Sequence, residues 1–127
     1  MKKILLGICT FLCLLVNAQL DTDHWFAPMS ARAGTSSLQS FLYLSTNEVT
    51  PFSVQIYNNN VLYNTVTINK GNPAQVSIPE SFLLATNPGD LMTSVPMGMY
   101  VKGPKKFFAN YRFSVTNHAE IITSKGL

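Results

Sequence analysis

The stretch FFANYRFSVTNHAEIITS, residues 107–124, carries the longest uninterrupted period-2 pattern in the chain. Up to Val115 its residues alternate between an apolar side and a largely polar side, as in a strand with one buried face. Residues 116–118 are typical of a turn, and the β-branched run 119–124 predicts a second strand that folds back beside the first. The predicted inward side chains are Phe107, Ala109, Tyr111, Phe113 and Val115. We expect the rest of the chain to pair with this ribbon or pack on it.

Upstream of the ribbon, short apolar runs are separated by turns rich in Asn, Pro and Gly. The predicted strands are 38–45, 52–57, 61–68, 74–78 and 97–102. The turns that separate them include Asn58–Asn60 and Gly103–Pro104, because these residue types suit turn conformations. In the strand 61–68 the predicted inward side chains are Leu62, Val66 and Ile68. This spacing indicates an all-β, Ig-like antiparallel sandwich of about seven or eight strands.

Two segments fit the strand pattern poorly. Residues 21–35 read as irregular, and residues 79–95 contain at most a helical turn or two at 81–85.

The chain is expected to be an N-terminal fragment of a longer protein, with a sandwich that is incomplete at its C-terminus, because a hydrophobic residue, Leu127, follows the last turn.

The first 18 residues read as a signal peptide. Lys2 and Lys3 precede an almost wholly apolar run, and the small-residue pattern that ends at Ala18 predicts cleavage there. The run is shorter than the roughly 20 residues that a spanning helix needs. Both cysteines, Cys9 and Cys13, belong to this segment. The exported part, residues 19–127, is therefore expected to contain no disulfide and to be secreted or held at the cell surface, without membrane insertion.

Charge gives little support to a polyanionic partner. The whole chain has 9 basic and 6 acidic residues, and loss of Lys2 and Lys3 leaves 7 against 6, a net charge of +1. A balance so close to neutral favours neither nucleic acid nor an anionic membrane as partner. The exported part is rich in Thr, Ser, Asn, Val, Phe and Tyr, a composition that suits sheets with one solvated face.

Several segments together resemble a known family. They are DHWFAPM, YLSTNEVTPFSVQIYNNN, INKGNPAQVSIP and YVKGPKKFFANYRFSVTNHAEIITSKG, which lie between Asp23 and Gly126. This order of strands and turns is similar to the N-terminal module of IgGFc-binding-protein-like surface proteins of bacteria. The resemblance implies a large, extracellular, gliding-associated protein exported by the type IX route, with neighbouring domains in the same chain. The chain as given shows neither the repeats nor the sorting domain of that family.

Metal or acid–base chemistry has two weak candidates in the sequence. Asp21, Asp23 and His24 place two carboxylates and an imidazole within four residues, a spacing that could contribute to a cation site. The segment lacks the further oxygen ligands and the glycine of a calcium loop, so a solvated N-terminal arm is the favoured interpretation. His118 and Glu120 would share one face of a strand, but a turn histidine is the simpler interpretation. No metal and no cofactor are predicted.

Catalysis has no recognisable motif in this chain. The nucleophile elbow G-x-S-x-G is absent from the sequence. Glycoside hydrolysis needs two facing carboxylates, and the pairs Asp90 with Glu120 or Glu48 with Glu80 have nothing in the sequence to single them out. We therefore predict that the chain is not an enzyme, with a carbohydrate-active domain as the less favoured alternative.

Exposed aromatic residues are the best candidates for binding. Trp25, Phe26, Tyr57 and Phe108 could form a platform for a protein or glycan ligand. Lys102, Lys105 and Lys106 crowd one predicted turn, where lysines usually mark a solvated edge. The predicted function is adhesion or recognition at the cell surface, and the alternative is a structural spacer without a ligand of its own.

Overall fold

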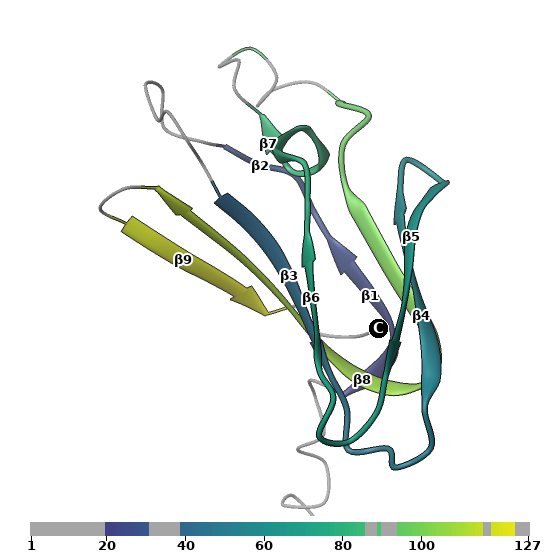
Figure 1. Cartoon of the computed structure of the whole chain (residues 1–127). Helices are drawn as coiled ribbons and strands as arrows, with labels where there is room; N and C mark the ends of the chain where they lie inside the picture. The colour runs from purple at the N-terminus through teal and green to yellow at the C-terminus, as the bar shows by residue number, and fades with distance from the viewer. Residues whose placement is uncertain (1–19, 31–38, 86–88, 90–93, 116–117, 124–127) are drawn as a thin grey trace, which may run out of the picture.

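The computed structural model describes residues 20–30, 39–85, 89, 94–115 and 118–123. The predicted signal peptide, Asp90 and the end of the chain lie outside these ranges. The strands are β1 Asp21–Phe26, β2 Met29–Ser30, β3 Gln39–Ser45, β4 Phe52–Asn58, β5 Val61–Ile68, β6 Ala74–Ser77, β7 Leu84–Ala85, β8 Met99–Val115 and β9 His118–Thr123, with one 3-10 turn, η1 Glu80–Phe82 (Figure 1). The prediction of an all-β, sandwich-like fold is confirmed, since seven of these strands form one curled antiparallel sheet.

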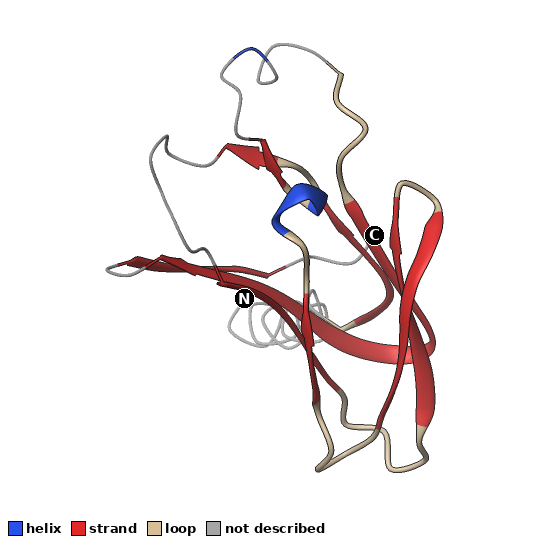
Figure 2. Ribbon diagram, turned by 45° about the horizontal axis from the view of Figure 1, so that its top comes forward, coloured by secondary structure: helices blue, strands red, loops and turns tan. Residues whose placement is uncertain are grey.

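Strand β8 is the axis of this sheet. The sheet runs in the order β5-β4-β8-β3-β6, and both β1 and β9 also pair with β8. Residues 99–102 of β8 lie between β1 and β4, whereas residues 110–114 lie between β3 and β9. Figure 2 shows the resulting curl, in which the two halves of the long strand belong to differently oriented parts of the sheet. The prediction of a ribbon at 107–124 around which the chain is arranged is thus confirmed, as β8 and β9.

The predicted turn at Gly103–Pro104 is wrong, because β8 continues through it. The pairing of β1 passes from Lys102 directly to Phe107, so residues 103–106 are skipped. A proline costs little there, since no ladder bond needs its missing amide proton. Gly103 approaches the core closely: a Cβ atom on it would lie 3.2 Å from ring carbons of Phe52 and Phe107. The Gly-Pro pair therefore marks a bend within one strand rather than the end of it.

The core lies inside the curl and follows the period-2 pattern. Phe107, Ala109 and Tyr111 are buried as predicted, and Phe113 is partly buried against them. The side chain of Val115 lies outside the described part. Strands β3, β4, β6 and β8 supply further buried residues, which are Leu42, Leu44, Phe52, Val54, Ile56, Val76, Met99 and Val101. One apolar cluster therefore joins both halves of the sheet.

The β4–β5 hairpin has the predicted turn, but not every side chain that was predicted to point inward does so. Asn59 and Asn60 take left-handed conformations, with φ of 50° and 64°, which Asn tolerates better than most residues. An irregularity between Ile56 and Tyr57 then shifts the register, so that Leu62 lies opposite Tyr57. Because a one-residue shift turns a side chain to the other face, Leu62 is 49% exposed, and its predicted inward position is wrong.

The N-terminal segment is more ordered than the sequence suggests. Residues 21–26 form β1 in place of the predicted irregular arm, and Met29–Ser30 pairs in parallel with Leu84–Ala85. The possible helix at 81–85 reduces to the single turn η1 followed by β7. Within the described ranges, no helix is long and apolar enough to cross a membrane.

Candidate functional site

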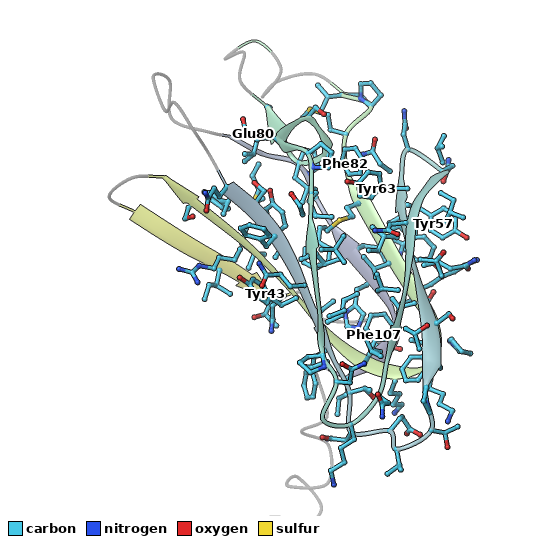
Figure 3. All side chains as sticks on the ribbon, in the orientation of Figure 1. Tyr43, Tyr57, Tyr63, Glu80, Phe82 and Phe107 are labelled. Carbon is cyan, nitrogen blue, oxygen red and sulfur yellow. The ribbon has the colours of Figure 1, made fainter. Side chains whose placement is uncertain are left out.

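An aromatic row crosses the outer face of the sheet, where strands β1, β8 and β4 lie side by side. Trp25, Tyr100 and Tyr57 are direct cross-strand neighbours. The Trp25 and Tyr100 rings stack with centroids 4.1 Å apart and planes 22° apart, and the Tyr57 centroid lies 5.9 Å from that of Tyr100. Figure 3 shows Tyr57 on the outer side of the sheet and Phe107 inside the curl. Leu62, opposite Tyr57, extends this row to a fourth strand.

A polar row lies next to the aromatic row, two residues along each strand. It consists of Asp23, Lys102 and Gln55, which are also direct cross-strand neighbours. The Tyr57 hydroxyl donates a hydrogen bond to Oε1 of Gln55 at 3.1 Å, and Nζ of Lys102 lies 5.2 Å from the Tyr57 ring centroid. These contacts hold polar and aromatic side chains together in one surface, which we call the β1–β8–β4 face.

Two hollows flank Tyr100 on this face. The first, which we call the end notch, has a volume of about 460 Å³ and lies where β1 ends, β8 begins and the β4–β5 turn projects; Trp25, Asn59, Asn60 and Met97 are among its lining residues. The second, the polar hollow, has a volume of about 500 Å³ and includes Asp23, Ser53, Gln55, Lys102 and Pro104. Tyr100 lines both, so it separates an aromatic–amide compartment from a polar one.

A hydrogen bond between Tyr100 and Asp23 fixes this dividing ring. The Tyr100 hydroxyl donates to Oδ1 of Asp23, and the Thr22 hydroxyl donates to Oδ2 at 2.7 Å. The bond to Asp23, with burial second, raises the pKa of Tyr100 to about 12. The bonds from Thr22 and Tyr100 hold the pKa of Asp23 below its ordinary value, although burial acts in the opposite direction. At neutral pH the pair is therefore a neutral phenol bonded to a carboxylate.

Substitution of Asp23 by asparagine is expected to bring the pKa of Tyr100 down from about 12 toward its ordinary value of 10.0, because the charged acceptor is lost. Because the pKa of Tyr100 is raised in the folded state, its hydrogen bond to Asp23 also stabilises the fold. This stabilisation is complete below pH 10 and is lost as the pH rises through about 12. NMR titration of tyrosine ring carbons checks the shift. Asp21→Asn is the matched control, since the Asp21 carboxylate bonds to Thr22. An unchanged Tyr100 pKa in Asp23→Asn would contradict the prediction.

The structure brings together only some of the residues that the sequence singled out. Trp25 and Tyr57 share the aromatic row, and Trp25 is 55% exposed. Phe26 is buried in the core, because neighbours along a strand point to opposite faces, so the prediction that it belongs to an exposed platform is wrong, although it is among the residues that line the end notch. Phe108 lies opposite Ser45 of β3, in the other half of β8. Tyr100 was not proposed from sequence, although it alternates with Met99 and Val101 in a predicted strand.

The candidate metal residues do not converge. His24 is fully buried, and its Nε2 lies 2.9 Å from the carbonyl oxygen of Phe107, whereas Asp23 faces outward to Tyr100. The favoured interpretation of this segment as a solvated arm is also wrong, because β1 is part of the sheet. Among the side chains that the structure describes, no three His, Cys, Asp or Glu residues cluster as metal ligands would. The side chains of His118 and Glu120 lie outside that set.

The lysines and acids take ordinary surface positions. Lys102, Lys105 and Lys106 belong to β8 rather than to a turn. Nζ of Lys105 lies 3.5 Å from a carboxylate oxygen of Glu48, a half-exposed ion pair of the kind that contributes little stability. Glu48 lies beside the turn that precedes β6, and Glu80 follows β6 at its other end, so this pair of acids is separated by that strand.

No protein-family model matches the chain, and the comparisons with curated proteins and with solved structures return no match. The resemblance to IgGFc-binding-protein-like modules stays a prediction from the sequence.

Proposed function

We propose that the chain is an exported recognition module of a larger bacterial extracellular protein, and that its ligand contacts the β1–β8–β4 face. The observation that carries this proposal is the aromatic row, in which three rings from three strands are held in register beside hydrogen-bonding side chains. Exposed Trp and Tyr side chains that are fixed in this way are typical binding anchors, because they bury a large area at low entropic cost.

The outward position of the aromatic residues favours a ligand-binding function over that of a structural spacer. The inward faces of β1, β4 and β8 already supply the core, so the outward Trp25, Tyr57 and Leu62 add nothing to it. The polar row beside them forms fixed hydrogen bonds and presents Lys102 and Gln55 to the polar hollow. A spacer has no need for such a surface, whereas a ligand with mixed polarity would use it.

The test is binding of the purified chain to a glycan array and to immobilised immunoglobulin, the ligand class that the family resemblance implies. We expect retention on one of them that Trp25→Ala weakens by about tenfold, because a stacked ring contributes on the order of 1 kcal/mol beyond its buried area. Tyr43→Ala is the matched control, since Tyr43 is a half-buried tyrosine on β3, which pairs with the other half of β8, away from the aromatic row (Figure 3). Absence of binding to both, or binding that Trp25→Ala leaves intact, would favour the spacer.

Export rests on the signal-peptide pattern alone. We expect the protein recovered from the medium of the producing cells to begin at Gln19, since cleavage is predicted after Ala18. N-terminal sequencing of the secreted protein checks this. Recovery of the intact chain in the cytoplasm, with Met1 or Lys2 at its start, would contradict it.

A further inference from the structure

We propose, building on the proposed function, that the ligand is a neutral oligosaccharide that lies along β8, from the end notch across Tyr100 into the polar hollow. Three features carry this inference. They are the chemistry of the notch, the fixed backbone of the turn that carries its amide groups, and the continuity of the two hollows along one strand.

The end notch combines aromatic and amide side chains without charge. Trp25 and Tyr100 form its aromatic wall, and Asn59 and Asn60 stand across from them on the β4–β5 turn. None of the described residues that line it is Asp, Glu, Lys, Arg or His. A side-chain amide both donates and accepts hydrogen bonds, as a sugar hydroxyl does, and an aromatic ring packs against the apolar face of a sugar ring. This chemistry favours an uncharged, hydroxyl-rich ligand.

The backbone that carries the amide groups of the notch is held in place before any ligand arrives. Asn59 and Asn60 occupy left-handed backbone conformations in a tight turn. Asn58, the residue before them, donates from Nδ2 to the carbonyl oxygen of Gly98 at 2.8 Å, which ties the turn to the start of β8. Gly98 itself has a φ of 143°, a conformation that side chains rarely adopt. Such preorganisation lowers the entropy lost on binding.

The polar hollow continues the site on the other side of Tyr100. It offers Ser53 and Gln55 as hydroxyl and amide partners, and it holds Asp23 and Lys102 as cross-strand neighbours of opposite charge. Because these two charges offset each other, the hollow favours a neutral ligand over an acidic or a basic one. Met97 and Pro104, at the two ends of this lining, are seven residues apart along the chain, a reach of up to roughly 23 Å of extended backbone. This length suits a chain of several sugars better than a single one.

A peptide fits this surface less well. Peptides that bind sheets usually add a strand to an open edge, where backbone groups are unpaired. Here the site lies on the face of three adjacent strands, and residues 99–102 of β8 have partners on both edges. The central strand of the site therefore offers a peptide no free backbone hydrogen bonds, so a peptide lying across this face would be recognised by side chains.

The experiment measures affinity of the full purified chain for neutral gluco-, manno- and galacto-oligosaccharides of increasing length, and for a uronate series as charged counterparts. We expect at least one neutral series to bind, with affinity that rises with chain length. Trp25→Ala is expected to weaken binding by roughly tenfold or more. Asn60→Gly keeps the left-handed backbone while removing the amide, and Gln55→Ala removes a group of the polar hollow; each is expected to weaken binding several-fold. Tyr43→Ala is the control, and thermal melts confirm that every variant is folded.

The outcomes separate this inference from the function on which it rests. Immunoglobulin binding that depends on Trp25, with no oligosaccharide bound, would overturn the inference and leave the proposed recognition function in place. Preferential binding of the uronate series would overturn the neutral character of the ligand. Affinity that Asn60→Gly and Gln55→Ala both leave unchanged would show that the ligand does not span the two hollows. If the chain binds neither an oligosaccharide nor immunoglobulin, both proposals are overturned.

Discussion

Substitution of Phe107 by alanine is expected to lower the free energy of unfolding by about 3–5 kcal/mol, a large part of the stability of a domain this size. Phe107 is fully buried and lies at the bend of β8, between the half that pairs with β4 and the half that pairs with β3. Its ring lies against Gly103 and 4.6 Å from the imidazole of His24, between centroids. Removal of the ring therefore leaves a cavity where the two parts of the sheet join, and a bent strand has little freedom to close it.

Urea unfolding followed by circular dichroism measures this loss. Phe108→Ala is the matched control, because it deletes the same ring from the adjacent position, which is half-buried on the opposite face of the strand. We expect a clearly smaller loss for Phe108→Ala and an intermediate one for Phe107→Leu, which retains part of the buried volume. Equal losses for Phe107→Ala and Phe108→Ala would contradict the assignment of Phe107 to the core.

Much of the sheet could be predicted from the sequence because its central strands alternate cleanly. In β4 the apolar Phe52, Val54 and Ile56 are separated by polar residues, and the structure buries all three. The Asn-rich turn after β4 was also predictable, since few residues other than Gly tolerate its left-handed backbone. Local pattern and turn chemistry agree in this hairpin until the register shifts at Tyr57.

Strand β1 was missed because a buried polar residue hides its alternation. His24 and Phe26 point inward and Asp23 and Trp25 outward, so the segment is a period-2 strand whose inward face contains an imidazole. A prediction based on the alternation of apolar residues therefore assigns residues 21–26 to a polar arm. The bend in β8 was missed for a related reason, because Gly103–Pro104 has the chemistry of a turn and only long-range pairing with four other strands continues the strand through it.

Two of the three rings of the aromatic row were predictable and the third was not. Trp25 and Tyr57 are two of the four aromatics that the sequence singled out, but the sequence does not say that β1 and β4 both lie against β8. Without that topology, Tyr100 is an ordinary residue of a short strand, and Asn60 is an ordinary turn residue. The site depends on non-local pairing, which is the part of a β fold that local patterns specify least.

Substitution of His24 by alanine is expected to lower the free energy of unfolding by about 2–4 kcal/mol, through loss of packing and of a buried hydrogen bond. His24 is fully buried, and its Nε2–H donates to the carbonyl oxygen of Phe107 at 2.9 Å, with the carbonyl oxygen of Asp21 at 3.3 Å. These carbonyl groups belong to the residue pair at which β1 resumes pairing after skipping residues 103–106. The imidazole thus supplies a bond where the ladder between β1 and β8 is irregular.

Two variants separate the packing of His24 from its hydrogen bond. His24→Phe keeps a ring of similar size but removes the donor, so we expect a loss of about 1–3 kcal/mol from an unsatisfied buried carbonyl. His24→Ala removes both, and the difference between the two losses measures the packing. Lys106→Ala is the control, since its exposed side chain lies in the same skipped segment and surface changes of this kind usually stay within about 0.5 kcal/mol. A His24→Phe protein as stable as the unsubstituted chain would show that packing alone holds β1 against the bend, and that the imidazole bond to Phe107 contributes no net stability.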